Sequence, residues 1–366
     1  MTDCIVVGGG IAGMCTARVL AQYGLSVTLV EAGHLGKESS WAGGGILSPL
    51  YPWRNPLAIT QLANLSQHRY PRWCEQLQQD TGIDPQWVRS GILYYDLTDS
   101  TQAQLWARQH HTSLHEKIAQ DNAPYVVEPP MWLMPDIAQL RNPRLIKALQ
   151  ADLVRRKVTS LQHQPVTDLL HKRGRIIGVQ TTNQRLYASH VIITAGAWSR
   201  KLFMMTGIEL PIRPIRGQMI LLQAQTDLCP HILLKAGHYL IPRQDGKILV
   251  GSTVEDVGFD KSTTAVALHT LKDVAIRLLP ALRTAPVIRK WAGLRPGTTE
   301  DGIPFIAQHP EIKGLYINSG HFRNGIVTSP ASAELIASLV TDQKPEIDPH
   351  PYRIQGRALF VERALS

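Results

Sequence analysis

The distribution of apolar residues over the first thirty positions predicts a strand, a helix and a second strand. Residues 4–7 (CIVV) form a short, uniformly apolar run, as expected of a strand buried on both faces of a sheet. Residues 11–23 have a helical composition, and Gly24 suits the left-handed position that follows many helices. Residues 26–30 form a second β-rich run. The chain is therefore expected to begin with a β–α–β unit.

Glycines occupy the turn between the first strand and the helix. Gly8, Gly10 and Gly13 have the spacing G-x-G-x-x-G, and Glu31 closes the second strand. Such glycines permit a tight turn, the close approach of a pyrophosphate and close packing of the helix on the strand, while the acid accepts hydrogen bonds from ribose hydroxyls. Because the strand, the helix and the acid are all in place, the segment predicts a dinucleotide-binding site.

The segment after Glu31 separates the two common dinucleotide cofactors. It reads AGHLGKESSWAGGGILSPL, with many small and hydroxyl residues and three consecutive glycines at 43–45. Trp41, Ile46 and Leu47 give it apolar anchors, which a flexible surface loop would not need. An NAD enzyme more often continues with another helix and strand. A long segment rich in accessible backbone instead suits an extended cofactor, and we interpret it as part of an FAD site.

The rest of the chain alternates predicted helices with predicted strands. Helices are expected at residues 57–80, 102–120, 143–156, 265–279 and 325–340, and strands at 88–97, 158–160, 176–181, 191–194 and within 314–320. Residues 124–135, which are rich in Pro and Met, are interpreted as a loop. Residues 238–253 alternate as in a β-hairpin with Asp245-Gly246 at the turn. The small residues 195–197 would let the backbone pass close to another group.

Nucleotide-domain elements are thus expected at both ends of the chain, with a β-rich region between them. The predicted fold class is α/β, with an FAD-binding Rossmann-like domain and a discontinuous, sheet-rich α+β substrate domain. The FAD-binding domain is expected to comprise residues 1–85, 140–205 and 290–366. The substrate-binding domain is expected to comprise residues 86–139 and 206–289.

Composition excludes several other classes of protein. The 366 residues are 44% hydrophobic and 18% charged, which is enough for a sizeable core and unlike a disordered chain. The formal net charge is +9, but Lys and Arg are scattered and do not predict a nucleic-acid surface. No uncharged run reaches the roughly 20 residues of a membrane span, and the glycine-rich start is not typical of a signal peptide. The four cysteines show no metal-ligand or disulfide spacing, so no metal is expected and a cytoplasmic location fits.

Two arginines near the C-terminus lack closely flanking acids. Arg295 lies in WAGLRPGT and Arg323 in GHFRNGI, each surrounded by Gly, Pro and apolar residues. Burying an arginine without a partner is costly, so each is a candidate site for an anion, and the planar guanidinium matches a carboxylate at two points. The alternatives are that Arg295 pairs with Glu300 or Asp301 in a surface turn and that Arg323 caps a carbonyl.

Six motifs together carry a resemblance to a known family. In chain order they are GGGIAG, ESSWAGGGIL, VIITAGAWS, HYLIPR, WAGLRPGT and GHFRNGI. They resemble the D-amino acid oxidase superfamily of FAD enzymes, and within it the glycine oxidases of the ThiO type, from residue 4 to about residue 340. GGGIAG alone is shared by many families, whereas the last three motifs together are distinctive. The resemblance implies an FAD-binding domain of the GR2 type.

The resemblance also implies roles for individual residues. The implied cofactor-binding residues are Gly8, Gly10, Ile11, Ala12, Gly13, Glu31, Ala32, Ser39, Ser40, Gly44, Gly45, Ile46, Val166, Gly196, His321, Phe322, Asn324, Gly325, Ile326 and Val327. The implied substrate-binding and catalytic residues are Tyr239, Arg295 and Arg323, although a tyrosine in an alternating strand also suits packing. Relatives with covalent flavin attach it through a C-terminal cysteine. This chain has no cysteine after Cys229, so a non-covalent FAD is implied.

The reaction implied by the resemblance is the oxidation of glycine and other small amines or amino acids to an imine. The imine hydrolyses to an oxo acid and ammonia, oxygen is the electron acceptor, and hydrogen peroxide is formed, in a pathway that makes the thiazole of thiamine. The expected partners are this small-molecule substrate and oxygen, without nucleic acid or membrane insertion, and a homo-oligomer is compatible. The loop at 48–56 (SPLYPWRNP) is richer in Pro and aromatic residues than the family leads us to expect, so the preferred substrate stays open.

Two other functions fit the same sequence features. One is a dehydrogenase of the same fold that passes electrons from glycine or a D-amino acid to a quinone at a membrane. The other is a flavin-dependent tRNA-modifying oxidase, which only the positive charge favours.

Overall fold

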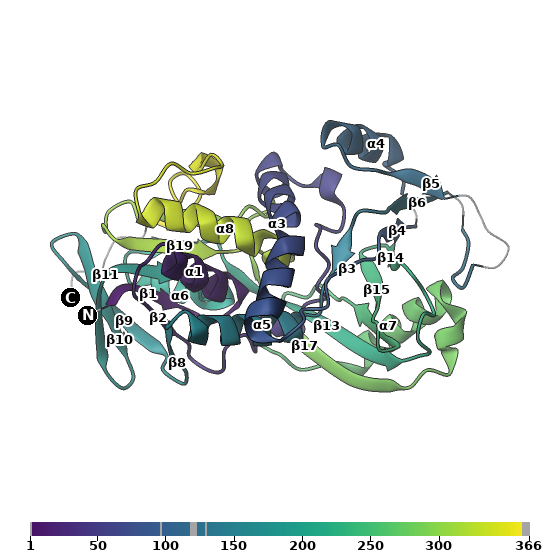
Figure 1. The fold of residues 1–366 in the computed structure, drawn as a ribbon, viewed down its shortest axis with the longest axis horizontal. Helices are drawn as coiled ribbons and strands as arrows, with labels where there is room; N and C mark the ends of the chain where they lie inside the picture. The colour runs from purple at the N-terminus through teal and green to yellow at the C-terminus, as the bar shows by residue number, and fades with distance from the viewer. Residues whose placement is uncertain (1, 96, 118–122, 129, 361–366) are drawn as a thin grey trace.

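Two eight-stranded sheets lie toward opposite ends of the long axis of the molecule (Figure 1). The structure is a computed structural model that describes residues 2–95, 97–117, 123–128 and 130–360. The path through the first sheet is β18 (Phe305–Gln308), β19 (Leu315–Ser319), β11 (Arg185–Ile193), β1 (Thr2–Val7), β2 (Val27–Val30) and β8 (Thr159–Leu161). The five strands from β19 to β8 are parallel, and β18 is antiparallel at the edge. Off this path, β11 pairs with β10 (Arg175–Thr181), which pairs with β9 (Val166–Lys172).

The first sheet is buried on both faces, which explains the uniformly apolar character of β1. Cys4 and Val6 belong to the core formed with α1 (Ile11–Gln22), α3 (Leu57–Thr81), α5 (Asn142–Arg155) and α8 (Gly325–Val340). Ile5 and Val7 point to the other face, into the core shared with α6 (Ser199–Met204) and the β9–β10 hairpin. Successive residues of β1 therefore pack alternately into two hydrophobic cores, one on each face of the sheet.

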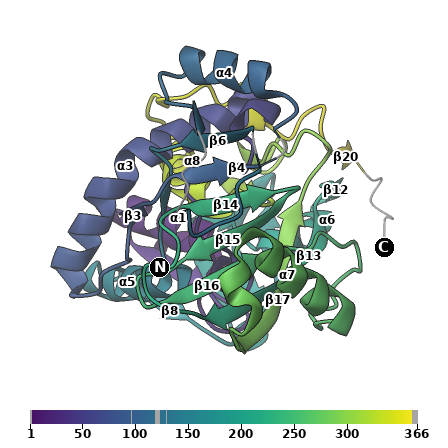
Figure 2. The ribbon, with the colours of Figure 1, turned by 90° about the vertical axis from the view of Figure 1, so that its right-hand side faces the viewer.

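The second sheet is mainly antiparallel and carries one long helix. Its order is β17 (Val287–Gly297), β13 (Arg213–Gln223), β16 (Lys247–Gly251), β15 (His238–Pro242), β14 (Ile232–Lys235), β4 (Ile92–Tyr94), β6 (Met131–Met134) and β5 (His115–Lys117). Helix α7 (Ala265–Leu278) packs on β13, β15 and β16, and Figure 2 views the molecule from this end. The smaller elements are α2 (Ser39–Ala42), α4 (Ser100–Gln109), β3 (Val88–Arg89), β7 (Ala138–Gln139), β12 (Ile208–Glu209), β20 (Leu359–Phe360) and the 3-10 turns η1 (Pro52–Arg54), η2 (Gly196–Trp198), η3 (Pro280–Arg283) and η4 (His350–Tyr352).

The predicted α/β architecture with a second sheet-rich region is confirmed, and so are most elements. The helix predicted at 102–120 is wrong in its second half, because α4 ends at Gln109, His111 has a positive φ of 50°, and residues 115–117 form β5; residues 118–120 lie outside the described part. The loop predicted at 124–135 was also wrong in part, because the apolar residues 131–134 pair as β6 between β4 and β5. Strand β9 was missed.

The division into two domains stays a prediction, but strand pairing bears on one of its boundaries. The boundary expected at residue 290 falls inside β17, which pairs with β13 from Val287 to Gly297. Because β17 pairs with β13 along its whole length, a boundary at the end of β17 fits the strand pairing better. Among the described residues, no helix combines the length and the apolar character needed to cross a bilayer.

A buried ion pair links the helices of the first sheet. Asp152 of α5 is fully buried and accepts hydrogen bonds from the Nε atoms of Arg18 and Arg156, each at 2.8 Å. We expect Asp152→Ala to lower the free energy of unfolding by about 3–5 kcal/mol, because two partly or fully buried guanidinium groups lose their carboxylate. Asp256→Ala removes the exposed pair with Arg213 and should cost no more than about 1 kcal/mol. Urea unfolding of both variants checks this, and equal losses would contradict it.

Candidate functional site

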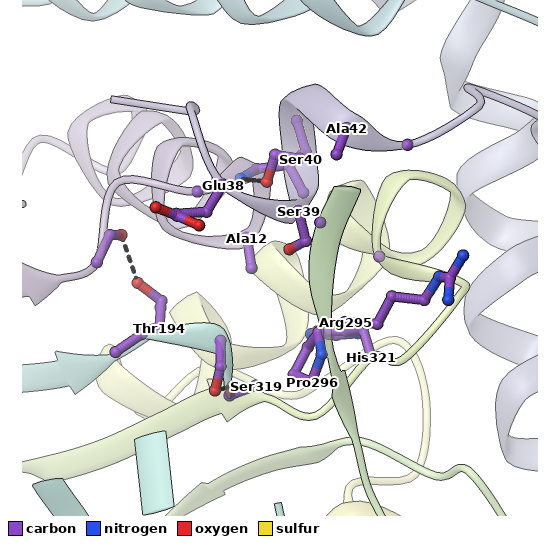
Figure 3. A pocket seen from close by; sticks show the side chains of 18 of the residues that line it. Ala12, Glu38, Ser39, Ser40, Ala42, Thr194, Arg295, Pro296, Ser319 and His321 are labelled. Atoms are coloured by element: carbon purple, nitrogen blue, oxygen red, sulfur yellow. Dashed lines mark hydrogen bonds between the residues drawn. The ribbon is translucent and has the colours of Figure 1, made fainter. Parts of the chain in front are cut away.

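One cavity of about 520 Å³ lies between the two sheets and is lined by residues from both. Figure 3 shows Ala12, Ser39 and Ser40 on one side, Thr194 beside them, and Arg295, Pro296 and His321 on the opposite side. The first group comes from the N-terminal β–α–β unit and the segment after it, and Arg295 comes from β17 of the second sheet. The sequence elements predicted to form a binding site therefore converge on one cavity.

The glycine turn at one end of the cavity leaves no room for side chains. A Cβ atom added to Gly8, whose φ is 109°, would lie 2.7 Å from the carbonyl carbon of Thr194. The Thr194 hydroxyl contacts the carbonyl oxygen of Gly8 at 2.7 Å. A Cβ at Gly13 would lie only 1.9 Å from the carbonyl oxygen of Gly8, so this glycine lets α1 pack against the strand. Gly13 itself does not line the cavity.

The Glu31 carboxylate accepts hydrogen bonds from the backbone of the glycine turn and of the segment after β2. Its Oε2 accepts a hydrogen bond from the backbone N–H of Gly9 at 2.7 Å, and its Oε1 accepts one from Gly33 at 2.8 Å. Each carboxylate oxygen has a second lone pair, so Glu31 can still accept hydrogen bonds from a ligand. Glu31 and Gly33 both line the cavity.

The N-terminus of α1 is joined to the next segment by a serine. Ser40 Oγ accepts a hydrogen bond from the backbone N–H of Ile11 at 2.8 Å, and the Ser40 carbonyl accepts one from the Asn142 side chain at 2.7 Å. This arrangement satisfies one of the backbone donors that every helix leaves free at its start. The segment 38–45 thereby lies against both α1 and α5 along the cavity.

Arg243 of the HYLIPR motif attaches the glycine-rich segment to the second sheet. Its guanidinium donates to the carbonyl of Gly44 at 2.6 Å, to that of Leu140 at 2.9 Å and to the side chain of Gln139 at 2.7 Å. Burial lowers the pKa of Arg243 to about 10, so it stays charged at neutral pH. The motif contributes to the family resemblance, but the local sequence indicates no role for its arginine, because its partners lie about 100 or more positions away in the chain.

The opposite wall is the start of α8, where His321 is held neutral. His321 is buried, its Nε2 contacts the Asn318 carbonyl oxygen at 2.9 Å, and its Nδ1 contacts the Thr328 hydroxyl at 3.0 Å. An amide oxygen only accepts, so the proton lies on Nε2, and Nδ1 faces the Thr328 hydroxyl, which also donates to the Asn324 carbonyl at 2.9 Å. Burial lowers the pKa of His321 to about 4. The residue therefore adds no charge to the cavity wall near neutral pH.

Tyr239, Arg295 and Arg323 all line the cavity. Arg295 donates from Nη2 to Ser252 Oγ at 2.7 Å and from Nη1 to the carbonyl of Thr253 at 3.0 Å. Burial lowers its pKa to about 10, and the charge of Arg323 acts in the same direction. No carboxylate of the described residues lies within 4.0 Å of either guanidinium. Two guanidinium groups thus share one cavity, and neither has a carboxylate partner among the described residues.

The alternatives considered for these residues have different outcomes. In the described part of the chain Arg295 forms no ion pair with Glu300 or Asp301. Asp301 instead lies near Arg357 and accepts hydrogen bonds from Thr299 and the backbone of Ile303. Arg323 does donate to a carbonyl, that of Gly237, at 3.2 Å. Its guanidinium has five donors, so this single bond leaves capacity for a ligand.

The remaining predicted site residues can be placed directly. All of the expected cofactor-binding residues except Gly13 and Val327 line the cavity, and Val327 is buried in the core. The cavity is also lined by residues to which sequence reasoning gave no role: Glu38, Ser48, Leu50, Gln164, Pro165, Thr194, Trp198, Lys201, Gly217, Met219, Gly293, Pro296, Asn318 and Ser319. Ser48 and Leu50 belong to the unusual loop at 48–56, which therefore does contribute to the rim. Glu38, Thr194, Trp198, Gly293 and Pro296 lie in the motifs that carry the family resemblance, but no individual role was assigned to them.

Comparison with known proteins gives one family and several near full-length relatives. The family model described as "DAO: FAD dependent oxidoreductase" matches residues 3–339. The chain is 46% identical to glycine oxidase of Pseudomonas putida, over 96% of this chain and 98% of that protein. It is 29% identical to the bifunctional protein ThiO/ThiG of Trichormus variabilis, over 94% of this chain and 53% of that longer protein. The crystal structure of glycine oxidase from Geobacillus kaustophilus superposes with a TM-score of 0.89 at 26% identity, over 97% and 98% of the two chains.

The neutral state of His321 predicts a pH dependence of stability. A histidine whose pKa falls from about 6.5 in the unfolded chain to about 4 in the folded one stabilises fully above pH 6.5 and loses that contribution as the pH falls toward 4. The loss should be on the order of 3 kcal/mol. We expect His321→Gln to show a shallower fall than the wild type between pH 7 and pH 4. Urea unfolding at several pH values tests this, and parallel curves for the two proteins would rule it out.

Proposed function

We propose, from the premise that the chain belongs to the DAO family of FAD-dependent oxidoreductases, that it oxidises glycine and other small amino acids to the imine. The proposed electron acceptor is oxygen and the second product is hydrogen peroxide. The proposed context is formation of the thiazole of thiamine, in line with the relatives named ThiO/ThiG. The cytoplasm is the proposed compartment, because all four cysteines are free thiols.

The residues of the cavity fit FAD. Gly8 offers a turn without side chains at the start of α1, where a pyrophosphate would meet the positive end of the helix. Glu31 would hold the ribose, with Val166 near the adenosine part. The segment 39–46 and residues 321–326 would then flank the flavin. The absence of a cysteine after Cys229 supports non-covalent binding.

The observation that supports an amino-acid substrate is that Arg295 and Arg323 have no carboxylate partner among the described residues. Arg295 and Arg323 line the same cavity as the glycine turn. The charge of Arg323 lowers the pKa of Arg295. Two such cations raise each other's cost of burial, and a bound anion offsets that cost. The carboxylate of an amino acid has the shape that a guanidinium binds at two points. We therefore assign the carboxylate-binding role to Arg295, with Tyr239 and Arg323 beside it.

Orientation is the main contribution of the chain to this reaction. A bound FAD supplies the acceptor for two electrons from the substrate. With the carboxylate held at Arg295, the α-carbon is restrained toward the wall formed by the start of α8. His321 is neutral and hydrogen-bonded on both nitrogens, so it is not assigned the role of a general base. The amine must arrive unprotonated, and holding two reactants in a fixed geometry provides much of the rate gain.

The proposed function is tested by oxygen uptake with glycine, with peroxide measured in parallel. We expect one peroxide per oxygen consumed, and comparable activity on small amino acids such as sarcosine and D-alanine. Reduction of a dye by glycine under argon, without oxygen uptake in air, would instead support the quinone-linked dehydrogenase. A yellow protein that oxidises none of these substrates would contradict the assignment.

Replacement of Arg295 tests its proposed role. Arg295→Lys keeps the positive charge but loses the planar fork, so we expect kcat/KM for glycine to fall by roughly 30-fold or more, which corresponds to about 2 kcal/mol or more. FAD content should be unchanged. The matched control is Arg289→Lys, on the same strand but exposed, which should have near-normal kinetics. Equal kcat/KM values for the wild type and Arg295→Lys would leave Arg295 with a structural role only.

A further inference from the structure

The guanidinium of Arg295 is held in place by neutral oxygen atoms. Ser252 Oγ accepts from Nη2 at 2.7 Å, and the backbone carbonyl of Thr253 accepts from Nη1 at 3.0 Å. The carbonyl of Arg216 lies further from Nη1, at 3.5 Å. Ser252 is 3% exposed, so water does not compete readily for this hydrogen bond. These neutral oxygen atoms satisfy N–H donors of the Arg295 guanidinium without neutralising its positive charge.

Glu255, the acid nearest in the chain to Ser252 and Thr253, pairs with residues other than Arg295. Glu255 forms an ion pair with Arg216 at 2.5 Å and accepts a hydrogen bond from the Gln218 amide at 2.9 Å. It also contacts the Thr253 hydroxyl. Arg216 and Gln218 are buried, and Arg216 pairs with Asp260 as well. This network fixes the loop that carries Ser252 and Thr253. It engages Glu255 elsewhere, so that in the described part of the chain no carboxylate lies within 4.0 Å of Arg295, although the charge of Glu255 still favours the charged form of the arginine.

Strand β13 provides the space that the guanidinium occupies. A Cβ atom added to Gly217 would lie 2.0 Å from Nη2 of Arg295 and 2.3 Å from its Cζ and Nη1. No side chain can therefore stand at this position while the guanidinium keeps its place. The slot next to Gly217 and the acceptors at 252–253 together determine the plane of the guanidinium.

We propose that Ser252 is a positioning residue that holds the Arg295 guanidinium in the plane in which it binds the substrate carboxylate; this rests on the proposed function. Ser252 Oγ accepts at Nη2, whereas the two carbonyl acceptors lie at Nη1. The Tyr239 side chain, which lines the cavity, also interacts with this guanidinium. A single anchored nitrogen would still permit rotation about the terminal bonds of the side chain. Anchoring Nη1 and Nη2 separately fixes the plane, and two-point binding of a carboxylate requires a fixed plane.

The test measures carboxylate binding without turnover. Acetate has the carboxylate of glycine but no amine, so its binding to the FAD-loaded protein can be followed by the change in flavin absorbance. In Ser252→Ala we expect the Kd for acetate and the KM for glycine both to rise roughly tenfold, as for loss of a hydrogen bond to a charged group. FAD content, melting temperature and kcat at saturating glycine should stay close to wild type. Ser252→Thr, which retains a hydroxyl, should recover most of the acetate affinity.

Two further variants make the result specific. Ser338→Ala removes a serine hydroxyl from the far end of α8, where it donates to the Glu334 carbonyl, and should leave acetate binding unchanged. Gly217→Ala should displace the Arg295 guanidinium and raise the Kd for acetate by a similar factor, although Ser252 is unchanged in this variant. An unchanged Kd for acetate in Ser252→Ala, with FAD retained, would overturn the proposal even if Gly217→Ala weakened acetate binding. A lowered melting temperature with unchanged acetate affinity would overturn it as well, since Ser252 would then be structural.

Failure of the proposed function would look different. A wild-type protein that contains FAD but neither binds acetate nor oxidises glycine would refute the function itself. A wild-type protein that does both, alongside a Ser252→Ala variant with the same acetate Kd, would refute only the positioning role.

Discussion

A positive charge held in a cavity without a negative partner is the constraint on which the rest of this site depends. Arg295 keeps its charge at neutral pH although burial lowers its pKa to about 10. A nearby carboxylate would stabilise that charge and at the same time occupy the position that a substrate needs. The structure satisfies the guanidinium with Ser252 and Thr253 instead, and pairs Glu255 with Arg216. A buried guanidinium without a carboxylate partner favours an anionic ligand, as the proposed role of Arg295 requires.

The same constraint explains why the site lies between two sheets. The glycine turn and Glu31 belong to the first sheet, whereas Arg295 and Tyr239 belong to the second. A cofactor as long as FAD can reach both. Arg243 holds the two parts in register, because it binds the carbonyl of Gly44 in one segment and that of Leu140 in another. A shift of one sheet against the other would break these hydrogen bonds before it moved Arg295 away from the cofactor site.

The wall formed by the start of α8 contributes shape and no charge. His321 is kept neutral by burial and is hydrogen-bonded to Asn318 and Thr328. Phe322, with a positive φ of 46°, is held by a hydrogen bond from its N–H to the carbonyl of Pro296, the residue after Arg295. This bond ties the wall to the strand that carries the arginine. If Arg295 binds the substrate as proposed, these backbone contacts would help to orient it.

The sequence by itself determined the local features of this protein. The strand, glycine turn, helix and acid of the first thirty residues occur where their pattern predicts them, because each depends on residues close together in the chain. The residue types and neighbours of Arg295 and Arg323 predicted an anion site, and the family resemblance added Tyr239; all three line the cavity. The tertiary structure alone decided which atoms surround them. Ser252 and Thr253 lie more than 40 positions from Arg295, and strand β6 forms within a Pro-rich stretch only because β4 and β5 pair with it. Strand β13 pairs with both β16 and β17 and so brings residues 252–253 near Arg295, and the pattern within one segment does not say which distant strand it will pair with.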